Sequence, residues 1–455
     1  MLVIDADSHK MENPFVFFDY LPAEYRDRLS PCIDKYGERR LVIRDYNPKT
    51  GENDLERVFP QPEGAGKGAF AAIHPESAIG AIFNRIRLEH MEREGIDAQV
   101  IFGSMTLAFE SILDPDLAIA CMRAYNDYIA EDCQAYRGKI LPVGFITLAD
   151  VGVAVAEMRR CVNELGMIAV HVPPSRPVPN PAAPAAFPVV RLPKHLSHPD
   201  FDPILTEAER LDVALGVHGS PGVYLPSGIA EQVDSFILSH IFGHRNQMQM
   251  ALSSCVFEGV FDRHPRLRIA FLEAGCGWVP DLVHAYHEHW EKRIRDFEPD
   301  VTIPPAAFAA EMIRERKGRA RTGLLAQTKQ AVALWRRRKR ERRIGDRDEF
   351  LFEHKNLDHD PVDFFRRGQV FTSFESDDPA PSYLKAALGE IGENIACFSA
   401  DYGHWDGVVA GCVGNVVKAA DYERPHLEKL LSGNCRRLYG ARLEHALGEA
   451  KLLSA

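Results

Sequence analysis

The chain opens with Met1-Leu-Val-Ile-Asp-Ala-Asp-Ser-His9, around which the rest of the sequence can be interpreted. The apolar run Leu2–Ile4 is typical of a buried strand. Asp5, Asp7 and His9 follow at a spacing of two, so a strand would present their side chains on one face. Acids and an imidazole at the end of a buried strand can converge on a metal ion. A polar strand that faces solvent is the alternative, and so short a motif needs partners elsewhere in the chain.

The composition is that of a folded globular protein: 45% of the 455 residues are hydrophobic and 26% are charged. The net charge of −11 provides no positive field for phosphates, so we expect no nucleic-acid partner. No apolar run approaches the length that spans a bilayer, and the early acids argue against a signal peptide, so we expect no membrane partner. The nine cysteines include no Cys-x-x-Cys pair, which fits reduced thiols in a cytoplasmic protein.

After residue 74 the sequence alternates between amphipathic helices, the first expected over residues 75–94, and short apolar strands. Together with the opening strand, strands are expected near residues 3, 100, 143, 169, 215, 270, 372 and 397. Eight strands that alternate with helices predict an α/β fold, a (β/α)8 TIM-like barrel of parallel strands. An open doubly wound sheet is the alternative. It would carry a glycine-rich turn after the first strand, where Ala6-Asp-Ser-His9 stands instead.

Two insertions interrupt what we expect to be one barrel domain over residues 1–455. Residues 10–74 follow the first strand and contain a candidate hairpin at Arg39–Gly51, and we interpret them as a lid or a subunit contact. Residues 304–364 separate the sixth and seventh strands and are helical and basic around Trp335–Arg343. We interpret this second segment as a solvated insertion that pairs with the acidic body or a neighbouring subunit, rather than as a nucleic-acid or membrane patch.

Metal-type ligands fall at the carboxyl ends of five of the eight expected strands, which is where barrels carry their chemistry. Strand one ends with Asp7 and His9, strand four with His171, strand five with His218, strand six with Glu273 and strand eight with Asp401. Any one of them could be a hydrogen-bonded core residue. Their coincidence predicts a metal-dependent site.

Four stretches resemble the amidohydrolase-related family, in the branch of aminocarboxymuconate semialdehyde decarboxylase and the resorcylate-type decarboxylases. They are Ile4-Asp-Ala-Asp-Ser-His9, the strand that ends in His218, Gly259–Trp278 and Ser399-Ala-Asp-Tyr-Gly-His404. The resemblance implies a distorted barrel with one divalent metal, whose ligands map onto Asp7, His9, His218 and Asp401. It also implies a small-molecule substrate and favours a homo- or hetero-oligomer.

Two imidazoles with one or two carboxylates suit Zn²⁺, Mn²⁺ or Fe²⁺ and leave room for a water. Such a metal lowers the pKa of that water and polarises a carbonyl or carboxylate. We therefore expect a hydrolase or carboxy-lyase that acts on a small organic or aromatic acid. Asp401 could accept the proton of the water, and His404 could orient Asp401 or touch the substrate.

Glu273 departs from the decarboxylase pattern, which has a catalytic histidine at the end of strand six. A carboxylate cannot supply the same cationic acid at neutral pH, and this weakens the decarboxylase interpretation. Glu273 is instead a candidate general base, supporting residue or metal ligand.

His240 and His244 suggest a second metal ion, because their spacing places both on one face of a helix. With His171 or Glu273 they could complete its ligands. The alternative function is then a dinuclear non-haem iron or manganese oxygenase with two metals per chain. Ordinary hydrogen bonds of two helix histidines are the competing explanation. A non-catalytic partner subunit is a third possibility, and the complete ligand set argues against it.

Overall fold

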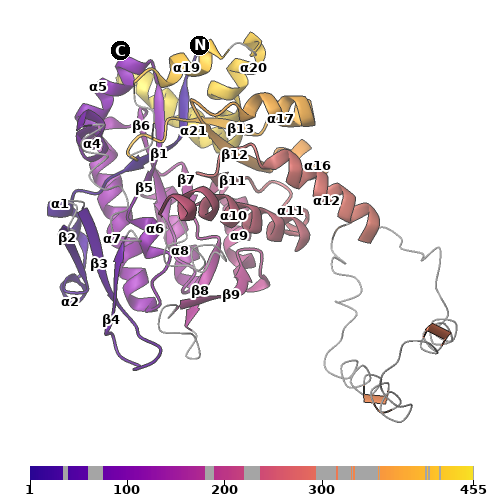
Figure 1. The fold of residues 1–455 in the computed structure, drawn as a ribbon. Helices are drawn as coiled ribbons and strands as arrows, with labels where there is room; N and C mark the ends of the chain where they lie inside the picture. The colour runs from indigo at the N-terminus through magenta and orange to yellow at the C-terminus, as the bar shows by residue number, and fades with distance from the viewer. Residues whose placement is uncertain are drawn as a thin grey trace. The chain divides into compact units, whose positions relative to one another are not determined.

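The computed structural model describes residues 1–33, 39–59, 75–179, 189–219, 236–293, 314, 315, 329, 332, 333, 357, 359–404, 407, 410–419 and 422–453. The chain divides into two compact units, one of Met1–Val283 with Val362–Ala455 and one of His284–Pro361 (Figure 1). Every candidate site residue belongs to the first unit. The basic stretch Trp335–Arg343 lies outside the described residues. The roles predicted for residues 304–364 stay predictions.

Eight parallel strands form the main sheet of the first unit, in the order β1-β5-β6-β7-β10-β11-β12-β13. They are β1 Ile4–Lys10, β5 Ala98–Gly103, β6 Ile140–Phe145, β7 Ala169–His171, β10 Ala214–His218, β11 Ile269–Leu272, β12 Val370–Glu375 and β13 Ala396–Ser399. β13 returns beside β1, where Ser399 Oγ donates to Asp7 O at 2.7 Å. The predicted strands and the predicted (β/α)8 barrel are confirmed.

Helices connect the strands along the chain (Figure 1). They are α4 Pro75–Ile82, α5 Asn84–Glu94, α6 Thr106–Phe109, α7 Pro115–Cys133, α8 Val151–Asn163, α9 Asp202–Leu211, α10 Phe236–Phe257, α11 Val260–Arg263, α12 Val279–Arg293, α16 Val362–Arg366, α17 Ala380–Leu388, α18 Glu390–Glu393, α19 Cys412–Lys418 and α20 Arg424–Glu428. Asp114 caps the amino terminus of α7, where its carboxylate accepts a hydrogen bond from the backbone N–H of Asp116 at 2.9 Å. The helix predicted over residues 75–94 is two helices, because Phe83 takes an extended conformation between them. Among the described residues, no helix is both long and apolar enough to cross a bilayer.

The segment after β1 forms a small antiparallel sheet of its own. It comprises α1 Pro14–Tyr20, α2 Ala23–Arg26, β2 Leu29–Ile33, β3 Arg39–Asp45 and β4 Leu55–Phe59. β3 and β4 form the predicted hairpin. Buried Asp45 ties them to the barrel, because its carboxylate accepts from Arg57 at 2.5 Å and from Leu113 N at 2.8 Å. A second hairpin, β8 Ser175–Pro179 with β9 Val189–His195, follows β7.

The helix α21 (Asn434–Leu453), which is broken at Gly440, closes the amino-terminal end of the barrel. Its Cys435, Leu438 and Tyr439 pack into one buried core with barrel residues such as Ile4 and Val100. Tyr439 OH donates to the backbone oxygen of Ala6, on β1, at 2.8 Å. The carboxyl ends of the strands, at the opposite end of the barrel, carry the candidate site.

Candidate metal centre

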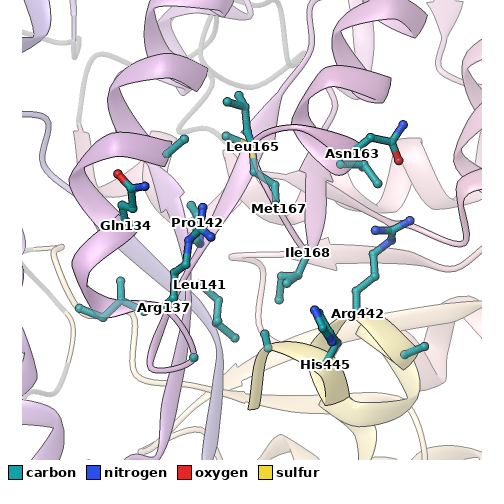
Figure 2. A pocket seen from close by; sticks show the side chains of 18 of the residues that line it. Gln134, Arg137, Leu141, Pro142, Asn163, Leu165, Met167, Ile168, Arg442 and His445 are labelled. Atoms are coloured by element: carbon teal, nitrogen blue, oxygen red, sulfur yellow. The ribbon is translucent and has the colours of Figure 1, made fainter. Parts of the chain in front are cut away.

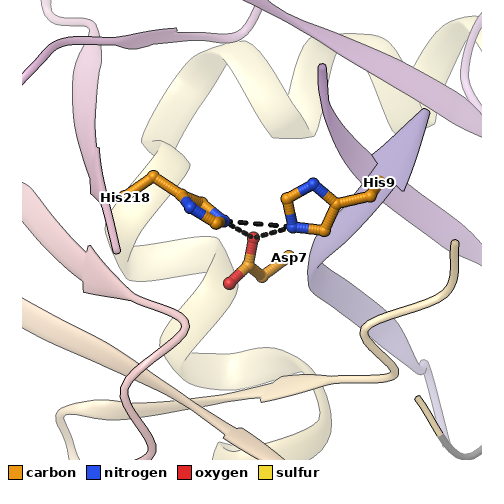
Figure 3. A group of neighbouring side chains, drawn as sticks. All are labelled: Asp7, His9 and His218. Atoms are coloured by element: carbon orange, nitrogen blue, oxygen red, sulfur yellow. Dashed lines mark hydrogen bonds and ion pairs between the residues drawn. The ribbon is translucent and has the colours of Figure 1, made fainter. Parts of the chain in front are cut away.

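Asp7, His9 and His218 meet at the carboxyl ends of β1 and β10, and all three are buried. Each offers a ligand-type atom, and the three atoms lie within 4.8 Å of one another. The Nε2 atoms of His9 and His218 are 3.0 Å apart. Asp7 Oδ1 lies 3.5 Å from His218 Nε2 and 3.8 Å from His9 Nε2. Figure 3 shows this carboxylate pointing at the gap between the two rings.

These distances fit a shared metal ion. Two ring nitrogens bound to one tetrahedral metal at about 2.0–2.1 Å stand about 3.3 Å apart. In the described part of the chain, Asp7 Oδ1 is buried without a hydrogen-bond partner, which is rare for a polar atom. Burial and the neighbouring His404 hold the pKa of His9 well below its usual value, which leaves the neutral imidazole that a metal needs. The donor set therefore fits a divalent metal.

Asp5 does not share this site, although the two-residue spacing predicts that it faces the same way. The pairing of β1 with β5 shifts register between Asp5 and Ser8, which interrupts the simple alternation. The Asp5 carboxylate accepts from Ser8 Oγ at 2.5 Å and from Gln99 Nε2 at 2.9 Å. Asp5 therefore stabilises the end of β1 through hydrogen bonds to Ser8 and Gln99.

Asp401 and His404, which follow β13, form a second group with His9. His404 Nδ1 lies 2.8 Å from Asp401 Oδ1 and 3.3 Å from Glu273 Oε1. The His404 ring stacks on the His9 ring with their centroids 3.8 Å apart. Burial opposes a charge on His404, but the carboxylates of Asp401 and Glu273 outweigh it and hold its pKa well above the usual value. The two carboxylates therefore favour the protonated form of His404.

Glu273, which follows β11, contacts both groups. Its Oε2 lies 2.9 Å from His218 Nδ1. Burial favours the neutral acid, but His218, His404 and His244 outweigh it and hold the pKa of Glu273 well below its usual value. Glu273 and Asp401 have φ angles of 53° and 45°, a left-handed conformation that costs about 1–3 kcal/mol and collects at functional sites.

The side chains of Glu273 and His404 are 13% and 16% exposed. Asp7, His9 and His218 are at most 2% exposed. Glu273 and His404 are therefore the more exposed members of the centre.

The histidines suggested for a second metal are His171, His240 and His244. Among the described residues, no group of three ligand atoms includes any of them. His171 Nε2 lies 2.8 Å from Glu110 Oε1 in a buried pair. His244 Nδ1 is 3.9 Å from Glu273 Oε1, and both of its ring nitrogens are buried without a hydrogen-bond partner among the described residues. The His240 ring lies 4.8 Å from the His244 ring. The second metal stays a prediction.

Two serines for which the sequence predicts no role position the acids. Ser373 Oγ, on β12, donates to Asp7 Oδ2 at 3.2 Å and accepts from Glu273 N at 3.2 Å. Ser399 Oγ, on β13, accepts from Asp401 N at 3.0 Å. Ser399 opens the quoted stretch Ser399–His404, whereas a place near a strand end is the one signal for Ser373, because serine is common in any strand.

The backbone of His9 is held from both sides by Tyr402 and Arg87, for which the motifs predict no role. Its N–H donates to Tyr402 O at 2.8 Å. Its carbonyl oxygen accepts from the buried guanidinium of Arg87, on α5. That guanidinium lies 4.5 Å from the centre of the Tyr402 ring, and Tyr402 OH is 2.6 Å from His90 Nδ1.

Residues 85–441 match the amidohydrolase family. The chain belongs to the amidohydrolase family. It is 23% identical over 190 residues to 2-amino-3-carboxymuconate-6-semialdehyde decarboxylase of Dictyostelium discoideum, covering 42% of this chain and 47% of that protein. It is 26% identical over 224 residues to gamma-resorcylate decarboxylase of Rhodococcus jostii, covering 49% of this chain and 62% of that protein. The matches thus span about half the length of these relatives.

A crystal structure of dihydroxybenzoic acid decarboxylase from a Polaromonas species, with bound manganese and the inhibitor 2-nitroresorcinol, shares the fold of this amidohydrolase-family chain. The TM-score is 0.56, and the alignment covers 96% of each chain at 17% identity. The resemblance predicted from the motifs is confirmed. The names of these relatives do not support the oxygenase alternative.

Proposed function

We propose that this protein is a divalent-metal-dependent carboxy-lyase that removes a carboxyl group from a small aromatic acid. The observation that carries the proposal is the buried group of Asp7, His9 and His218 with the His404 ring stacked beside it. The decarboxylases among its relatives supply the substrate class.

Asp7, His9, His218 and Asp401 would hold one metal per chain. The Polaromonas decarboxylase binds manganese, and this donor set suits Mn²⁺, Zn²⁺ and Fe²⁺. When bound, the metal supplies a positive charge that polarises a carboxylate, hydroxyl or water of the reaction. Ser373 and Arg87 keep Asp7 and His9 oriented for this task.

His404 is our candidate for the general acid that protonates the ring carbon. When the bond to the carboxyl carbon breaks, CO₂ leaves, the electron pair stays on the ring carbon, and that carbon takes up a proton. The His404 side chain is 16% exposed, and the carboxylates of Asp401 and Glu273 beside it favour its protonated form. It would supply the cationic acid that a glutamate at the end of β11 cannot supply.

Hydrolysis is the second candidate reaction. Asp401 Oδ1 lies 3.8 Å from His9 Nε2, where a carboxylate could accept the proton of a water that attacks the substrate. Both reactions use the same ligands, so product analysis separates them.

Metal content and CO₂ release test the proposal. Protein purified without chelator should contain about one divalent metal per chain and release CO₂ from one or more members of a panel of hydroxybenzoates, including 2,6-dihydroxybenzoate. His218→Ala should lose both properties, whereas the exposed control His289→Ala should keep both. Metal retained by His218→Ala would refute the ligand set. Two metals per chain with O₂ uptake would favour the oxygenase instead.

A further inference from the structure

A cavity of about 590 Å³ lies at the amino-terminal end of the barrel, away from the metal centre (Figure 2). Its apolar floor includes Leu141 and Pro142 of β6 together with Met167 and Ile168, which precede β7. Its walls include the carboxyl-terminal regions of α7 and α8 and the second half of α21. None of the candidate ligands lines it. A molecule bound here would not be the reacting substrate.

Arg137 is the free charge at this cavity. It lines the cavity after the short 3-10 helix Gln134–Tyr136, and the residue is exposed. Its guanidinium makes no hydrogen bond or ion pair with the residues that the structure describes. A free guanidinium beside an apolar floor can bind an anion in two parallel hydrogen bonds.

The second cation, Arg442, comes from α21. Its Nη2 donates to Leu211 O at 2.5 Å, and its Nε is buried without a hydrogen-bond partner among the described residues. Asp212 is the single acid among the described residues of the lining, and Arg268 Nη2 pairs with it at 2.8 Å. The remaining charge of the cavity is therefore positive.

We propose that this cavity binds a small organic anion with one carboxylate and an apolar body. Ligand sites commonly enclose about 300–1,000 Å³ and combine apolar walls with a few polar groups that fix orientation. Arg137 would bind the carboxylate, and Leu141, Met167 and Ile168 would contact the apolar body. The proposal is independent of the reaction at the metal centre.

Calorimetric titration of the metal-loaded full chain with 2-naphthoate tests this proposal. Arg137→Glu should weaken binding by about tenfold or more, the value of one charge-assisted pair. Because Arg137 has no protein partner in the described residues, this variant should fold and keep its activity. Arg123→Glu is the matched control. Arg123 is exposed on α7 and does not line the cavity, so this substitution changes the net charge equally without altering the proposed site. It should change the affinity by less than about twofold.

Two further arms separate the cavity from the metal centre, which could also take an aromatic acid. The cavity proposal expects 2-naphthoate binding to persist in His218→Ala and to weaken for the neutral 2-naphthamide. Binding of 2-naphthoate at two sites, one lost in His218→Ala and the other in Arg137→Glu, would also support the cavity proposal. Binding that vanishes in His218→Ala and is unchanged in Arg137→Glu would overturn it, as would no binding by the wild-type protein. A failure of the proposed decarboxylation would leave the Arg137→Glu result unaffected.

Discussion

The turn after β13 packs Gly403 directly on the backbone of His9. Gly403 has a φ of 119°, and a Cβ there would lie 2.5 Å from His9 O. Gly403→Ala should therefore displace His9 and lower the metal content of the purified protein. Gly411 is the matched control, because its φ is 79° but no atom lies within 4 Å of its Cβ position.

Gly411→Ala should cost about 1 kcal/mol of unfolding free energy from backbone strain and keep its metal. Metal analysis and urea unfolding of both variants measure these effects. Equal metal content in the two variants would show that the contact with His9 is unimportant.

Glu12 gives the protein a pH-dependent stability. Burial raises the pKa of Glu12 to about 8, although its carboxylate accepts from Met105 N at 3.1 Å. The folded protein therefore keeps a proton that the unfolded chain releases near pH 4.5, and stability falls as pH rises from about 4.5 to 8. Glu12→Gln keeps an acceptor for Met105 N and removes the charge.

Relative to wild type, Glu12→Gln should thus gain stability between pH 5 and pH 8, by at most about 5 kcal/mol. Urea unfolding at both pH values measures the change, with exposed Glu52→Gln as the control. Parallel pH profiles for wild type and Glu12→Gln would contradict the assignment.

At the scale of elements, α21 closes the barrel through buried hydrogen bonds as well as apolar packing. Tyr439 is 1% exposed, and its hydroxyl donates to Ala6 O at 2.8 Å. Tyr439→Phe should lower the unfolding free energy by about 1–2 kcal/mol, because a buried carbonyl of β1 loses its donor. Tyr383→Phe on α17, where the side chain is 60% exposed, should change it by less than about 0.5 kcal/mol. Equal costs in urea unfolding would mean that the hydrogen bond contributes nothing.

For the whole molecule, the proposed metal would join strands that are far apart in sequence. Its ligands come from β1, from β10 and from the turn after β13, the first, fifth and last barrel strands. A metal that binds only the folded state stabilises it by about 2.7 kcal/mol at 100 times its dissociation constant. Chelation should therefore lower the melting temperature of the wild-type protein. His218→Ala should show no such response, and a similar response in that variant would place the stabilising metal elsewhere.

The sequence was sufficient to predict the barrel, and the metal ligands that it suggests stay a prediction. Strand and helix periods are local properties, so eight strands could be counted from apolar runs alone. In a parallel barrel all strands end on one side, which is why Asp7, His9, His218 and Asp401 could be expected to converge. Local sequence patterns predicted the structure less reliably where the backbone conformation changes at a single residue. Phe83 splits a predicted helix, and the register shift near Asp5 removes that acid from the metal group.

Only the tertiary structure decided how the acids and histidines share protons and partners. His404 approaches Glu273 across 131 positions of sequence, and His171 pairs with Glu110 rather than with the other histidines. Arg87 reaches His9 from a helix, and α21 brings Arg442 to the opposite end of the barrel. These contacts depend on how helices and loops pack on the barrel, and no sequence period specifies that packing. The opening strand thus determined where a metal could bind, whereas packing determined which side chains surround it.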